Sequence, residues 1–368
     1  MRARGLLNPG AHELPPFPDA SGVRGFHRLL PGYGVTPLRE APSLAARAGV
    51  GRVLVKDESD RIGLPAFKIL GASWATYRAL LDHVGKPVGT PLDDLAGTDV
   101  TLTTATDGNH GRAVAHVAAH LGIPCRIFVP AGLAQARIDA ILGEGASCDV
   151  VDGTYEDAVA TAAATGDLVV SDTSWPGYET VPAWVIEGYA TIFDEIDEQI
   201  AAAGLPTPDV VLVPLGVGAL GAAVAQWFRS RGLATRIVGV EPEDADCLLK
   251  SVAAGDPVEV PGPHRSIMAG LNCGRPSDVA WPWVAGGFDA FVAIDDDSAR
   301  EGMRALAADD IVSGETGAAG AGALLAITGG QGDDAAVASL AVGDDTTVLL
   351  LSTEGATDPE AWEQVVHG

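Results

Sequence analysis

The stretch "VVLVPLGVGALGAAVA", residues 210–225, joins an apolar run to a glycine-rich loop and then to an alanine-rich segment. The run 210–216 is short and β-branched, which is typical of a strand covered on both faces, and 219–231 has the pattern of a helix. Gly216, Gly218 and Gly221 would let a ligand approach the backbone, and a helix N-terminus attracts phosphate. No Gly-Lys-Ser/Thr follows, so the loop is not a P-loop. Taken alone, it is equally consistent with an ordinary turn.

The same alternation of strand and helix extends over most of the chain. Strands are predicted in "VTLTTA", "CRIFVP", "CDVVDG", "LVVSDT", "VVLVPLG", "RIVGVEP" and "TVLLLSTEG". Helices are predicted over 110–121, 134–143, 154–164, 219–231 and 298–308. We interpret the Gly- and Asp-rich stretch 328–345 as a surface connection. This alternation indicates an α/β fold with mostly parallel sheets, in which ligands bind at loops after the carboxyl ends of strands.

Composition excludes several classes of partner. The 368 residues are 47% hydrophobic and carry a formal net charge of −26, which argues against nucleic acid because such a field repels phosphate. No apolar run of about eighteen residues occurs, and no signal-peptide pattern opens the chain, so we expect a cytoplasmic protein without a membrane span. The four cysteines form no C-x-x-C pair, and we expect no metal site. Any phosphate group must therefore be held by local amide dipoles.

Lys68 stands out among the four lysines. It lies in "RIGLPAFKILGASWA", residues 61–75, between Phe67 and Ile69. Burying an unpaired ammonium group costs several kcal/mol or more, so a lysine in such a run needs a reason. Lys56 leads into two acidic residues, Lys86 lies in a Gly-Lys-Pro loop, and Lys250 closes a helical stretch. We interpret those three as surface residues.

Two further loops carry polar side chains after predicted strands. In "TTATDGNHGRAVA", residues 103–115, hydroxyls, an amide and backbone N–H groups meet at a helix N-terminus, which suits a carboxylate. An N-cap with turn glycines explains that loop equally well. In "LLLSTEGATD", residues 349–358, Ser352 and Thr353 end a buried strand. Such residues are more often turn formers, unless a ring nitrogen needs a neutral hydrogen-bond partner.

Together these parts suit one cofactor. A lysine in an apolar site can form a Schiff base, because desolvation lowers the pKa of its amine. A glycine loop can hold one phosphate, and a serine at a strand end can face a pyridine nitrogen. Pyridoxal 5′-phosphate requires all three.

The assembled motifs resemble the fold type II pyridoxal-phosphate enzymes, the tryptophan synthase β and threonine dehydratase group. Within that group, "DTSWPGY" and "IMAGLNCG" make the chain most similar to diaminopropionate ammonia-lyase. The similarity also runs, in order, through "FHRLLPGYGVTPL", "LVKDESDRIGLPAFKILGASWA", "TTATDGNHGRAVA", "PLGVGALGAAVA" and "LLLSTEGATDP". The chain departs from the family pattern at Ile62, Pro65 and Ala356.

The resemblance implies a two-domain α/β fold, each domain a mostly parallel sheet flanked by helices, with the active site in the cleft between them. Residues 1–92 and 178–368 would form the large cofactor-binding domain, and 93–177 a small mobile domain inserted in it. It also implies a homodimer. The expected reaction is α,β-elimination of 2,3-diaminopropionate to pyruvate and ammonia.

The resemblance also assigns roles to residues. Lys68 would hold the cofactor, Asn109 would bond its phenolic oxygen, and Ser352 would face the ring nitrogen. The phosphate would lie on the loop formed by Gly216, Val217, Gly218, Ala219, Leu220 and Gly221. Thr104 and Thr106 would bind the substrate carboxylate.

Two carboxylates remain for acid–base chemistry and for the distal ammonium of a diamine: Asp107 and Asp172. From the family we expect Asp107 to serve the D-isomer and Asp172 the L-isomer. Without the family, Asp172 would be interpreted as a cap before Thr173 and Ser174. His110 is expected to pack near the cofactor, and Trp175 and Tyr178 to shape a lid. Cys247 and Cys273 flank a loop and are expected to stay reduced.

Two alternatives stay open. A serine or threonine dehydratase, or another β-eliminating enzyme of the same fold, would share most of these residues, although a hydroxyl substrate needs no carboxylate for a distal ammonium. A non-catalytic nucleotide or amino-acid binding protein is the alternative from another class. It would lack the absorbance band of a Schiff base.

Overall fold

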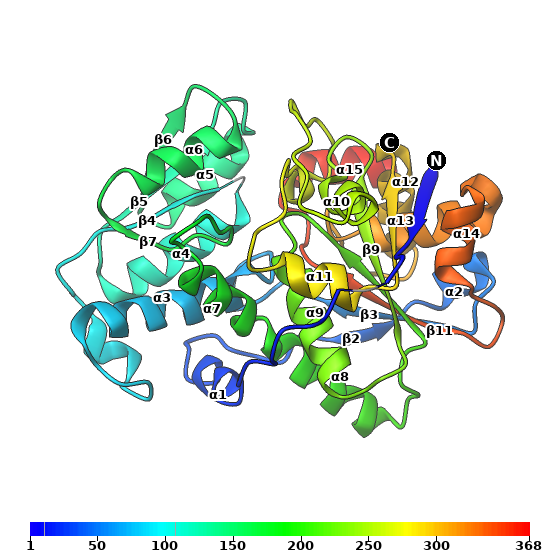
Figure 1. The fold of residues 1–368 in the computed structure, drawn as a ribbon, viewed down its shortest axis with the longest axis horizontal. Coiled ribbons are helices and arrows are strands. Elements are labelled where there is room, and N and C mark those ends of the chain that lie inside the picture. The colour runs from blue at the N-terminus through cyan, green and yellow to red at the C-terminus, as the bar shows by residue number, and fades with distance from the viewer. Residues whose placement is uncertain (11, 107) are drawn as a thin grey trace.

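The chain folds around two β-sheets that lie side by side (Figure 1). The structure is a computed structural model that describes residues 1–10, 12–106 and 108–368. In the larger sheet the strand order is β1-β10-β9-β8-β11-β3-β2. The bounds, in that order, are Ala3–Leu7, Ala290–Ile294, Arg236–Pro242, Val210–Pro214, Thr347–Ser352, Arg52–Asp57 and Leu38–Glu40. The five inner strands are parallel, and only β1 and β2 at the edges run antiparallel.

The smaller sheet has four parallel strands in the order β6-β5-β4-β7. Their bounds are Ser147–Val151, Cys125–Pro130, Leu102–Ala105 and Leu168–Val169. All four strands lie within 93–177, and all strands of the larger sheet lie outside it, as the predicted division into domains requires. The limits of that division stay a prediction.

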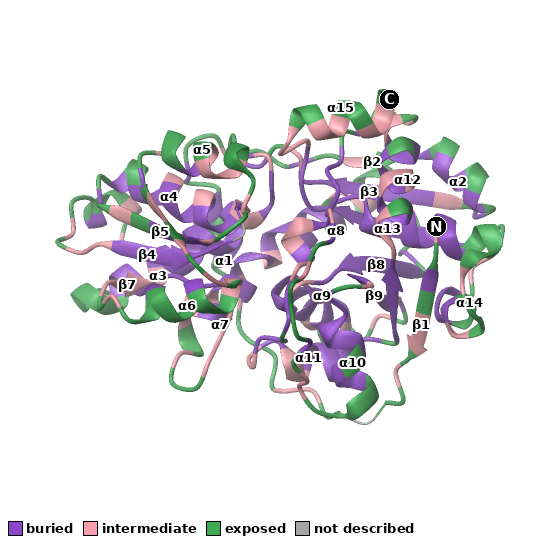
Figure 2. Cartoon of the chain, turned by 90° about the horizontal axis from the view of Figure 1, so that it is seen from above, coloured by how far each residue is buried: buried purple, intermediate pink, exposed green. Residues whose placement is uncertain are grey.

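Helices flank both sheets (Figure 2). The five inner strands of the larger sheet and β4 of the smaller sheet are almost completely buried, whereas β1, β2, β6 and β7 are partly exposed. The helices that precede β8 in the chain are α1 Val23–His27, α2 Pro42–Ala48, α3 Lys68–Val84, α4 Asn109–Leu121, α5 Gln135–Gly143, α6 Tyr155–Ala163, α7 Thr180–Gly188 and α8 Ala190–Ala203. Those after it are α9 Ala219–Ser230, α10 Cys247–Ala254, α11 Trp281–Gly287, α12 Asp296–Ala307, α13 Ala319–Ala326, α14 Asp334–Leu340 and α15 Pro359–His367. The α/β fold class is confirmed, and so are the five predicted helices, within two residues at each end.

Two parts of the sequence interpretation need correction. The stretch 328–345 is not a plain connection, because it contains the end of a π-turn, Ile327–Gln331, and then α14. Asp333 caps α14 by accepting a hydrogen bond from the Ala336 amide at 2.7 Å, and Ala336 and Leu340 are buried. The many Gly and Asp residues of this stretch therefore include the N-cap of a helix as well as turn residues. The sequence interpretation also missed four strands, β1, β2, β3 and β10.

Helices α3 and α7 cross with almost no side chain between them. A Cβ atom at Gly188 would lie 2.6 Å from the Leu70 carbonyl oxygen, and one at Gly71 would lie 2.6 Å from the Tyr189 ring. Glycine is therefore required at both positions. This crossing fixes the first turn of α3, where Lys68 lies, against the chain that enters α8. Within the described residues, no helix is both long and apolar enough to span a bilayer.

Candidate active site

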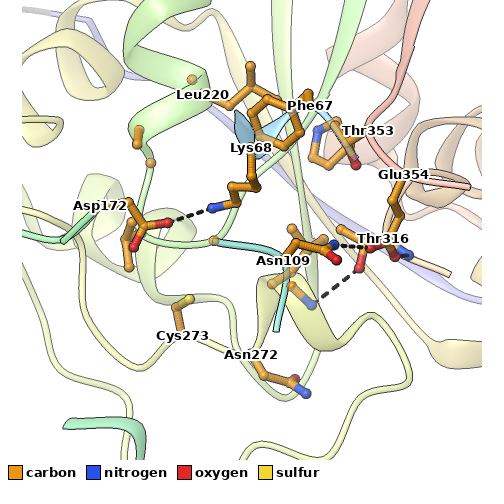
Figure 3. A pocket seen from close by; sticks show the side chains of 18 of the residues that line it. Phe67, Lys68, Asn109, Asp172, Leu220, Asn272, Cys273, Thr316, Thr353 and Glu354 are labelled. Carbon is orange, nitrogen blue, oxygen red and sulfur yellow. Dashed lines mark hydrogen bonds and ion pairs between the residues drawn. The ribbon is translucent and has the colours of Figure 1, made fainter. Parts of the chain in front are cut away.

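Lys68 is the first residue of α3, and its side chain reaches a cavity between the two sheets (Figure 3). Its Nζ donates to Oδ2 of Asp172 at 2.6 Å, and it lies 5.6 Å from the centre of the Phe67 ring. The side chain is 19% exposed. The predicted apolar setting is present, and the structure adds a carboxylate from a segment 104 residues away.

The interpretation of Lys56 as a surface residue is wrong. Its side chain is completely buried at the end of β3, and Nζ donates to the Thr36 carbonyl, to Glu195 and to Gln199 at 2.8, 2.8 and 3.0 Å. Glu195 lies on α8, so the neighbouring residues in the sequence could not reveal this partner. Lys250 is 45% exposed and pairs with Asp246, and Lys86 is exposed. These two follow the prediction.

The glycine loop connects β8 to α9, and Gly216 to Leu220 with Gly221 line the cavity. Gly218 adopts a left-handed conformation, φ 100°, immediately before the helix. A Cβ at Gly216 would lie 2.9 Å from the Gly270 carbonyl oxygen, so no larger residue fits there. The first amides of a helix have no acceptor within the helix, and those of α9 open on this cavity. The loop therefore offers an anion cradle made of backbone alone.

Asn109 opens α4 and lines the same cavity from the side of the smaller sheet. Its Nδ2 donates to Oε2 of Glu354 at 2.6 Å (Figure 3), and Oε1 of Glu354 accepts from the Thr316 amide at 3.2 Å. Glu354 is only 1% exposed. The sequence analysis gave it no role, although an acidic residue directly after a strand-end Ser-Thr pair was a signal. It fixes the orientation of Asn109.

The structure describes two of the three residues of the 103–115 loop that were predicted to bind substrate, Thr104 and Thr106, and they lie in different places. Thr106 lines the cavity, and its hydroxyl oxygen accepts from the amides of Gly108 and Gly111 at 2.9 and 3.0 Å. Thr104 belongs to β4, is buried away from the cavity lining, and donates to the Ala105 carbonyl at 3.1 Å. The structure thus argues against Thr104 as a ligand of the substrate. Asp107 lies outside the described residues.

At the end of β11 the structure favours Thr353 over Ser352. The Ser352 hydroxyl donates to Oγ of Ser313 at 2.8 Å, so it is used within the protein. Thr353 lines the cavity, is 4% exposed, and its Oγ1 has no hydrogen-bond partner among the described residues. Ser352 is the last residue of β11 and Thr353 follows it, and their hydroxyls lie in different surroundings.

Asp172 lies just after β7 and is 6% exposed. Besides Lys68, it faces His110, whose Nδ1 is 3.9 Å from Oδ2. Nε2 of His110 lies 2.8 Å from the Val170 carbonyl and therefore carries a proton. Burial alone would raise the pKa of Asp172, but His110 and Lys68 together hold that pKa well below its usual range. The carboxylate is ionised beside the lysine, and His110 is packed near the site as predicted.

A second, wider cavity of about 540 Å³ adjoins the first and shares Tyr155, Val217 and Cys273 with it. Helix α6 forms one wall, and the segments 173–176 and 273–278 form the others. Trp175 stacks on Tyr178 at 4.2 Å between ring centres. The site therefore adjoins a wider vestibule that Trp175 lines.

Comparison with known proteins agrees with this geometry. The model of the family described as "Pyridoxal-phosphate dependent enzyme" matches residues 29–343. The diaminopropionate ammonia-lyase of Escherichia coli (strain K12) is 41% identical in an alignment of 365 positions that covers 95% of this chain and 91% of that protein. This chain is a member of the diaminopropionate ammonia-lyase family of pyridoxal-phosphate dependent enzymes.

Other members of the ammonia-lyase family match over the same extent. The Salmonella typhimurium (strain LT2) diaminopropionate ammonia-lyase is 37% identical over 94% of this chain and 91% of its own length. A crystal structure of the E. coli enzyme in complex with an aminoacrylate-PLP azomethine reaction intermediate superposes with a TM-score of 0.91 at 37% identity, and covers 100% of this chain and 97% of that one. The predicted fold type II architecture is confirmed.

Proposed function

We propose that this protein converts 2,3-diaminopropionate and water into pyruvate and two molecules of ammonia by α,β-elimination, with pyridoxal 5′-phosphate as cofactor. One observation carries the proposal: the ammonium of Lys68 and the carboxylate of Asp172, 2.6 Å apart, line a cavity together with a glycine loop. The similarity to diaminopropionate ammonia-lyases over nearly the whole chain supports the substrate.

The residues present fit the cofactor. A backbone cradle that a Cβ would fill accepts the phosphate, and the unpaired, buried hydroxyl of Thr353 suits a ring nitrogen as a neutral partner. When bound, the cofactor withdraws electrons from the substrate Cα, which makes its proton removable. Lys68 would hold the aldehyde carbon, Asn109 would bond the phenolic oxygen, and the amides of 216–221 would hold the phosphate. For the ring nitrogen we now propose Thr353 instead of Ser352.

A pair of matched variants tests that reassignment. Thr353→Val keeps the shape of the side chain and removes the hydroxyl, so we expect weaker cofactor retention and a shifted absorbance band. Ser352→Ala removes a hydroxyl bonded to Ser313 and should leave the band unchanged. The reverse pattern would restore Ser352 to the role.

Asp172 is placed to exchange protons with the substrate. With Lys68 attached to the cofactor, the Asp172 carboxylate would lie beside the attachment point. There it could accept the Cα proton of one isomer or bind the distal ammonium of the substrate. Thr106, which lines the same cavity, is proposed to bind the substrate carboxylate with neighbouring amides. Asp107 stays the proposed base for the D-isomer, and Asp172 the base for the L-isomer.

The isomers provide the experiment. Asp172→Asn should lower kcat with L-2,3-diaminopropionate on the order of 10²–10⁴-fold while the cofactor stays bound. Asp107→Asn should do the same with the D-isomer. Ammonia and pyruvate released per minute measure both. Equal, small losses for both isomers in both variants would mean that the aspartates are structural, and Lys68 would be left as the base.

The serine or threonine dehydratase alternative is decided by substrate. We expect pyruvate from 2,3-diaminopropionate to form much faster than pyruvate from serine or 2-oxobutyrate from threonine, since the ionised Asp172 suits an ammonium better than a hydroxyl. The opposite ranking would favour the dehydratase. A homodimer is also proposed from the family resemblance, and a cytoplasmic location from the sequence pattern. Light scattering of the purified protein checks the homodimer.

A further inference from the structure

Two serines from distant segments meet beside the cavity. Ser174 follows Asp172 by two residues, and Ser277 lies in the segment before α11. Their Oγ atoms are 2.8 Å apart, and the Ser174 amide donates to Oγ of Ser277 at 3.2 Å. The Val279 amide donates to Oγ of Ser174 at 3.1 Å. Ser277 is only 1% exposed. Each hydroxyl oxygen thus accepts a hydrogen bond from one backbone amide, and one of the two hydroxyls donates to the other.

Each serine is also tied to a part of the candidate site. The Ser277 amide donates to the carbonyl of Val217 at 2.9 Å, and Val217 lies in the middle of the glycine loop. On the other side, Ser174 belongs to the short segment that carries Asp172. A continuous chain of hydrogen bonds therefore runs from the glycine loop through Ser277 and Ser174 to the aspartate segment.

The aspartate segment is compact enough to move as a unit. The Tyr178 hydroxyl donates to the Val169 carbonyl at 2.8 Å and accepts from the Ser171 amide at 3.0 Å. The Trp175 ring stacks on that of Tyr178 with 12° between the planes. These contacts span Asp172 on both sides. A shift transmitted to Ser174 would consequently reach the carboxylate beside Lys68.

We propose that Ser174 and Ser277 are positioning residues that couple occupancy of the 216–221 loop to the placement of Asp172. This inference rests on the proposed function, in which that loop holds the cofactor phosphate. A phosphate on the loop amides orders the Val217 peptide, whose carbonyl fixes Ser277, and Ser277 in turn fixes Ser174. A buried amide that loses its acceptor destabilises the fold, so the hydrogen bonds through the two serine hydroxyls are not easily broken.

Hydrogen exchange of the full-length protein measures the coupling directly. Amide exchange in a peptide spanning 168–179 is compared with and without pyridoxal 5′-phosphate, in the parent and in Ser174→Ala and Ser277→Ala. We expect the cofactor to slow exchange there in the parent, and either variant to reduce that slowing about 5-fold or more, in the range of ordinary site–site coupling. Ser277→Thr keeps the hydroxyl and should restore it. Ser230→Ala, whose hydroxyl donates to the Trp227 carbonyl at the far end of α9, is the control.

The outcomes separate this inference from the proposed function. If the parent binds no cofactor and forms no pyruvate, the proposed function fails. If the parent is active but Ser174→Ala and Ser277→Ala keep the full cofactor-dependent slowing, the coupling is absent and the inference is overturned. Among the described residues, no hydrogen bond joins Ser174 to the glycine loop, so Ser174→Ala should lower kcat while the Kd of the cofactor stays within about 2-fold of the parent. Unchanged kcat in that variant also counts against the inference.

Discussion

Lys56 and Lys68 are twelve positions apart and both contact a carboxylate, but their surroundings differ. Lys56 is entirely buried, and its three donors are used by Thr36, Glu195 and Gln199. Lys68 contacts Asp172 at a similar distance but is 19% exposed and lines a cavity. A buried lysine with an acidic partner is therefore not by itself a mark of catalysis. Access to a ligand is what separates the two.

The region of Lys56 supports the region of Lys68. Arg61 donates to Glu58 and Glu195, so the buried cluster of Lys56, Glu58, Arg61 and Glu195 holds two cations and two carboxylates. The backbone of Arg61 also closes a tight turn with Leu64, in which Ile62 has a φ of 56°. Ile rarely adopts this conformation, so the cluster holds a strained turn just ahead of Lys68.

The largest expected effect separates the two lysines by activity. Lys68→Ala should abolish the Schiff-base absorbance and lower pyruvate formation on the order of 10⁴-fold or more, since the cofactor loses its attachment. The melting temperature should fall less than on loss of Lys56, because the Lys68 side chain is 19% exposed and His110 stays beside Asp172. Lys250→Ala is the matched control, because that side chain is 45% exposed. Retained absorbance in Lys68→Ala would move the attachment to another lysine.

The converse effect is on stability. Lys56→Met leaves Glu195 buried with one cation fewer, and removing one partner of a buried pair costs about 3–5 kcal/mol. We expect urea unfolding to show that loss, while the molecules that remain folded keep their kcat. Adding Glu195→Met to Lys56→Met should not restore the stability, because the buried Arg61 would lose its hydrogen bonds to Glu195. A catalytic role for Lys56 would instead show as lost kcat without lost stability.

A smaller effect tests how firmly α3 is held. Gly71→Ala places a Cβ within 2.6 Å of the Tyr189 ring, one turn after Lys68. Overpacking of this kind costs about 1–3 kcal/mol, and it should also disturb the lysine and reduce cofactor occupancy. Gly143→Ala, at the last residue of α5 and with nothing within 4 Å of the added Cβ, is the control for stability. Full occupancy and unchanged stability in Gly71→Ala would mean that the crossing of α3 and α7 relaxes easily.

The smallest effect is the pH dependence of stability near the Lys56 cluster. Burial lowers the pKa of His27 to about 3, and its Nδ1 accepts from Thr191 while Nε2 donates to the Leu70 carbonyl. The imidazole of His27 binds a proton more readily in the unfolded chain than in the folded one. The free energy of unfolding is therefore at its full value above about pH 6.5 and decreases as pH falls below that, by about 1.4 kcal/mol per pH unit. Burial opposes ionisation of Glu195, yet Arg61 and Lys56 lower its pKa to about 2, which adds loss below about pH 4.5. Urea titrations at pH 7.5, 6.5 and 5.5 measure the loss due to His27, and His27→Gln should make the free energy of unfolding nearly independent of pH over this range.

Local sequence predicted much of the site, and failed at identifiable places. Lys68 was singled out by its apolar setting, the glycine loop by its strand-to-helix junction, and Asn109 by the family resemblance, and the structure places all three at one cavity. The choice between Ser352 and Thr353 depends on which way each hydroxyl points, which neighbouring residues in the sequence do not determine. Lys56 was misassigned because its partner, Glu195, lies 139 residues further along the chain.

By itself the sequence determined the α/β class, the two glycine-containing junctions and the family, because periodicity and short motifs are properties of neighbouring residues. The tertiary structure alone decided which charges meet. It brought Asp172 to Lys68, Glu354 to Asn109, and Ser174 to Ser277 across 104, 245 and 103 positions. Electrostatic and hydrogen-bond energies depend on distances of a few ångströms between side chains. Those distances are fixed only when the two sheets pack together.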